Sequence, residues 1–309
     1  MKLLFILPIF GWILLQPGIS HSQTVQRNIR TPEYKALQNR ISKGWNTWYN
    51  NSVISHALLP EGFSINLCLA RPGSADYLRE TFKASDIKKR PEKIILGLRS
   101  DDGSYTSMVL KYKGEEFSIR SATDGDDELI LIAPLKASKS NLVVEAGLLW
   151  NRPGTIGMEN NQLTGIFPGH RVQVHATAQP ITDAYTVTTA PHLTFSLKSE
   201  VGIYTGKART LTEIKSILDE HAKEQQKRID SYGDLSEPFK AMQTILAWNT
   251  VYDAPNNRVI TPVSRLWNNG WGGFVLFDWD TYFASYMLSS FDKDLAYANA
   301  VEITKAITP

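Results

Sequence analysis

A stretch near the end of the chain, residues 265–283, gathers side chains of the types that bind carbohydrates. It holds three tryptophans, two aspartates, one arginine and three glycines. Aromatic rings stack on the apolar faces of sugars, carboxylate and guanidinium groups hydrogen-bond the hydroxyls, and glycines let a loop approach a ligand closely. The composition therefore predicts one wall of a carbohydrate site, with these candidate contacts: Arg265, Trp267, Trp271, Asp278, Trp279 and Asp280.

The same residues also have ordinary structural explanations. Asp280 lies where its carboxylate could cap a helix that begins at Thr281. The tryptophans could fill the space between two domains. Their joint occurrence in one glycine-rich loop, beside an arginine and two carboxylates, favours the sugar-binding interpretation.

A second aromatic cluster lies near the other end of the chain, at residues 44–52. It contains two tryptophans, one tyrosine and three asparagines within nine residues. One hypothesis is a sugar-contacting loop that uses Trp45, Asn46 and Trp48. The other is a turn whose aromatic side chains fix it to the core, and the sequence does not decide between them.

The secondary structure expected around these clusters changes along the chain from strands to helices. Between residues 61 and 205, short runs of β-forming residues alternate with Gly, Pro, Asn and Asp, with no helical period between them. This pattern is typical of a β-sandwich. The runs expected as strands are 64–70, 93–98, 105–112, 129–133, 142–149, 171–176, 185–189, 193–197 and 201–204.

The apolar period becomes helical at Thr210. Thr210 and Glu213 have the spacing of a capping box, and apolar residues then recur at three and four positions, which predicts a linker helix. Further helices are expected over 31–42, from Ser236, over 281–289, and from a cap at Asp292 to residue 307. An extended segment is expected over 258–266. Helix pairs with the chemistry in their loops suggest an α/α architecture.

The N-terminus has the features of a secretory signal peptide. Lys2 is followed by an apolar run over residues 3–15, and Ser20 and Ser22 provide small residues before a cleavage site at Gln23. The run is short for a membrane span and contains Pro8. We therefore expect a secreted or periplasmic protein of a bacterial envelope, with no membrane span after cleavage.

The composition limits the classes of partner and cofactor that can be expected. The net charge of +2, with no run of Lys or Arg, gives no sign of a nucleic-acid partner. No phosphate-binding glycine loop and no Cys/His metal pattern is present, so no cofactor is expected. The acidic turn 124–128 lacks the spacing of an EF-hand, although a structural calcium ion stays an open alternative. The single cysteine, Cys68, lies in an expected strand and is predicted to be a buried, inert thiol.

The segments 261–267 and 277–283 resemble a known enzyme clan. They read Thr-Pro-Val-Ser-Arg-Leu-Trp and Phe-Asp-Trp-Asp-Thr-Tyr-Phe. The chain thereby resembles the inverting α-glycosidases of glycoside hydrolase family 63, the mannosylglycerate hydrolases and the trehalases. The order of β-sandwich, linker helix and α-helices is similar to that of family 63. The bacterial mannosylglycerate-hydrolase-like members also tend to carry a segment like Gly-Trp-Asn-Thr-Trp, present here over 44–48.

This resemblance implies an (α/α)6 barrel in which a Trp-Asp pair holds the sugar to be cleaved. Trp279 would border the ring and Asp280 would accept hydrogen bonds from its hydroxyls. Arg265 is a less secure match, because it lies farther from Trp279 than in the trehalase pattern, and Asp278 has no counterpart in the family core. Inversion needs two carboxyl groups on opposite faces of the ring. In the family these groups lie on later loops, so the acid/base pair is expected beyond Pro309.

The combined prediction is a multidomain chain, β first and then α. We expect a signal peptide over 1–22, a β-sandwich over 23–205, a linker helix over 206–235, and the first helices of an incomplete (α/α)6 toroid over 236–309. The predicted function is an exo-acting, inverting α-glycosidase for α-linked glucosides or mannosides, with a disaccharide or oligosaccharide substrate. The alternative is a non-catalytic carbohydrate-binding or structural module of a bacterial polysaccharide-utilisation system, and a weaker one is an isomerase or lyase on the same toroid.

Overall fold

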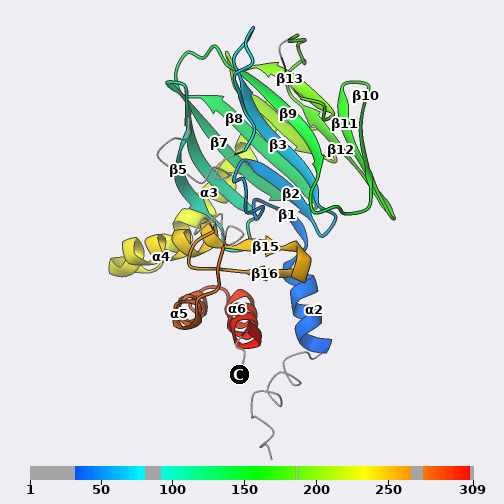
Figure 1. Cartoon of the computed structure of the whole chain (residues 1–309). Coiled ribbons are helices and arrows are strands. Elements are labelled where there is room, and N and C mark those ends of the chain that lie inside the picture. Colours follow the sequence, from blue (N-terminus) through cyan, green and yellow to red (C-terminus); the bar gives the residue numbers. More distant parts are fainter. Residues whose placement is uncertain (1–31, 81–91, 185, 187, 266–273, 307–309) are drawn as a thin grey trace, which may run out of the picture.

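Two β-sheets packed face to face form the larger part of the molecule (Figure 1). The computed structural model describes residues 32–80, 92–184, 186, 188–265 and 274–306. The first sheet has six strands, with β4 paired to β3 beside the path β1-β2-β3-β9-β13. Its strands are β1 (Gly44–Asn46), β2 (Ser55–Leu59), β3 (Phe63–Ala70), β4 (Tyr77–Leu78), β9 (Asn141–Leu148) and β13 (His192–Ser196).

The second sheet has eight strands in the order β10-β11-β12-β14-β8-β7-β6-β5. All the strand pairs that the structure describes in these two sheets are antiparallel. The strands are β5 (Glu92–Arg99), β6 (Tyr105–Tyr112), β7 (Glu115–Asp124), β8 (Asp127–Pro134), β10 (Thr155–Glu159), β11 (Gln162–Phe167), β12 (His170–Ala176) and β14 (Val201–Thr205). The segment expected as a strand over 185–189 is irregular at 186, 188 and 189.

Strand β8 shows why an unbroken apolar run can form a strand in this fold. Side chains alternate between the two faces of a strand. Ile130 and Ile132 lie in the core between the sheets, whereas Leu129 and Leu131 point to the outer face, where a helix covers them. Both faces of β8 are therefore buried, and the sequence has no polar alternation there.

The covering helix is α3 (Leu211–Asp230), which the sequence predicted as a linker. Its capping box is confirmed, because the Thr210 hydroxyl accepts from the amide of Glu213 and the Glu213 carboxylate accepts from the amide of Thr210. Ile214 and Leu218 are fully buried against the outer face of the second sheet. The helix is thus also a packing element of the sandwich.

The remaining elements form a helical layer at one end of the sandwich (Figure 1). The hairpin of β15 (Val251–Asp253) and β16 (Arg258–Ile260) lies between the sandwich and the helix pair α5 and α6. The helices of this layer are α2 (Pro32–Ile41), α4 (Ser236–Asn249), α5 (Asp278–Leu288) and α6 (Lys293–Ala306), with short 3-10 turns η2 (Gly233–Leu235) and η3 (Ala254–Asn256). The predicted cap of the last helix is confirmed, since Asp292 Oδ1 accepts from the amide of Leu295 at 2.9 Å.

The predicted fold class, a β-sandwich followed by the start of an (α/α)6 toroid, is wrong. The described chain is mostly β-sheet, and its few helices do not form a toroid. The most extensive helix–helix contact in the described part of the chain is that of α5 with α6, whereas α4 packs on β5 and a β-hairpin interrupts the helices after Asn249. The physical reason is that the apolar helix faces are buried against β-structure: Leu246, Ala284 and Leu288 share one cluster with Leu59 of β2 and Val259 of β16.

Helix α2 also differs from the predicted division, which placed it with the sandwich. Its buried residues Tyr34 and Leu37 pack against Ala298 and Val301 of α6. The chain therefore begins its described part in the helical layer and returns there after the sandwich. Among the described residues, no helix has the length and apolar character needed to cross a membrane.

Glu302 connects three elements of the helical layer. Its buried carboxylate accepts hydrogen bonds from the hydroxyl of Tyr34 on α2, from Nη1 of Arg258 on β16 and from Nζ of Lys305, each at 2.7 Å. Burial alone would raise the pKa of Glu302, but the hydrogen bonds from Lys305, Arg258 and Tyr34 outweigh it, and the pKa is lowered. The ionised form is therefore the one that the fold stabilises.

Replacing Glu302 by Ala is expected to lower the free energy of unfolding by about 1–3 kcal/mol, because the half-buried Arg258 guanidinium loses one charged acceptor and keeps only Asp253. Urea denaturation at pH 7 measures this change. The stabilising effect of a carboxylate with a lowered pKa is present above its unfolded-state pKa and is lost as pH falls through the folded-state pKa, so the difference from wild type should shrink on acidification.

Asp294 supplies the control on the same helix. It pairs with Arg40, but both side chains are exposed, so Asp294→Ala should change stability by less than about 1 kcal/mol. Equal losses in the Glu302 and Asp294 variants would contradict the role given to Glu302.

Candidate functional site

The sequence-predicted sugar site centres on the first turn of α5. The helix begins at Asp278, three residues earlier than expected, and Phe277 occupies the N-cap position in an extended conformation without a side-chain cap. Asp280 therefore lies inside the first turn and does not cap a helix from Thr281. Both carboxylates still lie near the positive end of the helix dipole, which favours them by roughly 0.3–1 kcal/mol.

The side chains of this turn are available to a ligand. Trp279 is 66% exposed, Asp278 is exposed and Asp280 is half-buried. Neither aspartate forms a side-chain hydrogen bond or ion pair within the part of the chain that the structure describes. Their oxygens thus keep their capacity to accept hydrogen bonds from a ligand beside an open indole ring.

Trp279 begins an exposed aromatic stripe along α5. Tyr282, Phe283 and Tyr286 follow at intervals of three, four and seven residues, which places all four side chains on one face of the helix. The exposed fractions of Phe283 and Tyr286 are 57% and 77%. The ring of Phe283 stands edge-on to that of Trp279 at a centroid distance of 5.7 Å. Contiguous exposed aromatic side chains make this face of α5 a candidate binding surface.

The opposite face of α5 explains how the stripe is held. Thr281, Ala284, Ser285 and Leu288 are buried, and Asn299 of α6 donates to the carbonyl of Thr281 at 3.3 Å and to the hydroxyl of Ser285 at 3.2 Å. Small and polar side chains let the two helices pack closely. This packing directs the bulky aromatic side chains away from the interior.

Arg265 does not belong to the exposed site. Its side chain is buried, and the guanidinium donates to the carbonyls of Trp248, Thr47 and Tyr49 at 3.1, 3.1 and 2.7 Å. Burial lowers the pKa of Arg265 to about 9. The predicted contact with sugar is incompatible with this position, since every near partner is a backbone carbonyl of the protein.

The N-terminal aromatic cluster is also largely internal. Trp48 is buried in the cluster that joins the sandwich to the helices, and Trp45 is buried in the sandwich core, edge-on to Phe63. Asn46 accepts from Nη2 of Arg99 at 2.9 Å and donates to the carbonyl of Asp102 at 3.1 Å. These contacts favour the packing explanation for Asn46 and Trp48. Trp267 and Trp271 lie outside the described residues.

Asp278 and Asp280 do not have the geometry of an acid/base pair for inversion. The two groups of such a pair must approach opposite faces of one sugar ring, about 6.5–9.5 Å apart. The aspartates lie two residues apart within one helical turn, so both approach from the same element. They are suited to binding hydroxyl groups.

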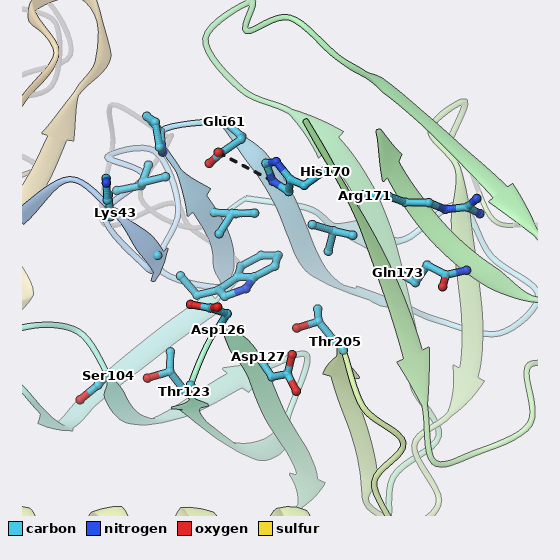
Figure 2. Close-up of a pocket in the computed structure, with 18 of the residues that line it drawn as sticks. Lys43, Glu61, Ser104, Thr123, Asp126, Asp127, His170, Arg171, Gln173 and Thr205 are labelled. Carbon is cyan, nitrogen blue, oxygen red and sulfur yellow. Dashed lines mark ion pairs between the residues drawn. The ribbon is translucent and has the colours of Figure 1, made fainter. Parts of the chain in front are cut away.

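A second concave surface lies at the open end of the sandwich (Figure 2). It is a cavity of about 930 Å³ between the β1–β2 hairpin of the first sheet and strands β7, β8, β12 and β14 of the second. Its polar lining includes Glu61, Thr123, Asp126 and His170, and Trp45 contributes to its apolar wall. Within the described ranges, no group of three or more His, Cys, Asp or Glu side chains is placed to hold a metal ion.

Sequence reasoning missed part of both surfaces. The helical spacing of Tyr282, Phe283 and Tyr286 from Trp279 would have indicated the stripe if the helix had been predicted to begin at Asp278. The cavity residues gave no signal, because they come from segments far apart in the chain and belong to motifs that are ordinary in isolation. The cysteine prediction is confirmed: Cys68 is a buried free thiol whose pKa is raised by burial.

Two comparisons with known proteins found no match. No protein-family model matches the chain, and no curated protein matches it significantly. The support for a function therefore comes from the two surfaces described above and from the sequence motifs.

Replacement of Trp48 and of Trp279 by alanine should have different effects on the free energy of unfolding. Trp48→Ala should lower the free energy of unfolding by about 3–5 kcal/mol, because it removes a large buried side chain. Trp279→Ala should change it by less than about 0.5 kcal/mol, because the side chain is mostly exposed. Denaturant unfolding monitored by far-UV circular dichroism measures both, and a comparable loss in the two variants would mean that Trp279 is a packing residue.

Proposed function

We propose that the first turn of α5 is a sugar-binding subsite, in which Trp279 stacks on a pyranose ring and Asp280 accepts hydrogen bonds from its hydroxyls. The observation that carries the proposal is the exposure of Trp279 directly beside carboxylates without partners among the described residues. Exposure of the apolar indole surface to water is unfavourable, and stacking on the apolar face of a sugar ring would remove part of that surface from water. Asp278 supplies a second acceptor on the same turn, and Phe283 supports the indole from its edge.

The activity proposed for this subsite is that of an exo-acting, inverting α-glycosidase on α-linked glucosides or mannosides. The support is the resemblance of segments 261–267 and 277–283 to that clan, together with the accessibility of the matched pair Trp279 and Asp280. The proposal gives Trp279 and Asp280 roles in sugar binding and assigns no catalytic residue. A secreted or periplasmic location follows from the predicted signal peptide over 1–22, which lies outside the described residues.

The competing proposal is a carbohydrate-binding module without catalytic activity. The cavity at the end of the sandwich favours it, since it offers a second concave surface with polar groups. The two proposals differ in product. Proton NMR of a mixture with an α-linked disaccharide should show release of the β-anomer if the protein is an inverting glycosidase, whereas binding without release would favour the module.

Titration calorimetry with maltose and α-mannobiose tests the subsite. Asp280→Asn keeps the shape of the side chain and removes its charge, so affinity for the bound disaccharide should fall about 10- to 100-fold, as expected for a hydrogen bond to a charged group. Trp279→Ala should weaken binding by at least about tenfold, because the stacking surface is lost.

Tyr297→Ala is the matched control. Tyr297 is an exposed aromatic residue on α6 and does not belong to the stripe on α5. Its replacement should leave disaccharide affinity unchanged. Wild-type affinity in both Trp279→Ala and Asp280→Asn would refute the subsite.

A further inference from the structure

The cavity at the end of the sandwich is built from both sheets and does not involve α5. Lys43 before β1, Trp45 on β1 and Glu61 after β2 form one wall, and the opposite wall comes from the second sheet. Its volume of about 930 Å³ lies within the range of small-molecule sites. Figure 2 shows Glu61 and His170 facing each other on one side, with Asp126, Thr123 and Thr205 on the other.

The β7–β8 turn presents Asp126 to this cavity. The turn is a two-residue hairpin loop of Gly125 and Asp126, because Asp124 pairs with Asp127 in the strand register. Gly125 has a φ of +65°, the conformation that the first central position of such a loop favours. Arg209 holds the base of the turn through Asp124 and lowers the pKa of that carboxyl by its hydrogen bond. Asp126 therefore has a fixed backbone position and an exposed side chain.

Several charged groups of the lining are already neutralised by neighbours. Arg171 pairs with Glu159 at 2.7 Å, and Asp127 lies 3.4 Å from the guanidinium of Arg209. Asp126, in contrast, has no side-chain partner in the described part of the chain. Oε1 of Glu61 lies 3.7 Å from Nε2 of His170 and the side chain is 24% exposed, whereas its other oxygen, Oε2, is buried without a hydrogen-bond partner among the described residues.

The chemistry of the lining identifies a class of ligand. Carboxylate oxygens without partners accept hydrogen bonds, and the hydroxyl of Thr123 both donates and accepts. The carboxylates of Glu61, Asp102 and Asp126 outnumber the one lysine of the lining, Lys43, and this excess of negative charge disfavours anionic ligands. Trp45, Leu58 and Val172 add apolar surface to the same wall. Acceptors beside an aromatic and aliphatic wall suit a ligand that is rich in hydroxyl groups, has apolar faces and carries no negative charge.

We propose that this cavity is a second saccharide site, which binds a short neutral oligosaccharide independently of α5. Asp126 and Glu61 accept hydrogen bonds from its hydroxyls. The inference rests on the cavity that supports the binding-module proposal and names its ligand. It shares only its ligand class with the subsite on α5, and none of its residues lies in the helical layer. The sandwich would hold a sugar chain while the first turn of α5 holds another sugar unit.

The experiment uses the whole chain in a Trp279→Ala background, so that binding at α5 is disabled. The probes are three trisaccharides: neutral maltotriose, cationic glucosamine trimer and anionic trigalacturonate. Calorimetric titration of the Trp279→Ala variant should detect maltotriose and not trigalacturonate. Adding Asp126→Ala should weaken maltotriose binding by at least about tenfold, and Glu61→Gln should weaken it in the same direction.

Glu200→Gln is the control, because Glu200 pairs with Lys215 and neither residue of this ion pair belongs to the lining. It should leave maltotriose affinity unchanged, and circular dichroism should show that every variant is folded. Failure of maltotriose to bind the Trp279→Ala variant would overturn the second site, as would unchanged affinity after Asp126→Ala. Binding of the glucosamine trimer alone would overturn the assignment to a neutral ligand.

The design separates this inference from the subsite on α5. Wild-type protein should show two sites for maltotriose, Trp279→Ala should keep only the cavity, and Asp126→Ala should keep only α5. Loss of one site without the other therefore tells which proposal fails.

Discussion

The position of the helical layer depends on one buried cation. The guanidinium of Arg265 reaches three backbone carbonyls, two from the segment after β1 and one from Trp248 near the end of α4. A buried charge is costly unless it is hydrogen-bonded, so these contacts fix the two segments against each other. Its pKa, lowered to about 9 by burial, keeps it protonated at neutral pH. The sandwich and the layer that carries α5 are thus joined by hydrogen bonds as well as by apolar packing.

The three described tryptophans that the sequence offers as sugar contacts divide into two groups that the sequence does not distinguish. Trp45 and Trp48 fill the core of the sandwich and its junction with the helices, whereas Trp279 stands on the surface of α5. The difference comes from the inner face of α5, which is made of small side chains such as Ala284 and Ser285. The proposed subsite therefore follows from helix packing: the close contact between α5 and α6 leaves no interior space for bulky rings, and they gather on the outer face.

Local signals in the sequence predicted local structure well. The capping box at Thr210 and the cap at Asp292 are confirmed because both depend on neighbouring residues alone. The start of α5 was misplaced because Phe277 provides no side-chain cap. The (α/α)6 prediction failed for a non-local reason. Helical periodicity indicates which face of a helix is buried, but it does not indicate which element covers that face. In this protein much of the covering element is β-structure. The cavity in the sandwich was not predicted, since its walls come from residues 43–61, 102–127, 170–173 and 205–206.

The most direct test of the proposed subsite is the response of individual indole groups to a sugar. Nitrogen-15 labelling of tryptophan gives one indole resonance for each side chain, and replacement of Trp279 and Trp48 by Phe identifies two of them. On titration with maltose, the account predicts a saturable shift of the Trp279 resonance and no shift of the Trp48 resonance, because only the first indole is open to solvent. A Trp279 resonance that stays unchanged at saturating sugar would contradict sugar binding at α5.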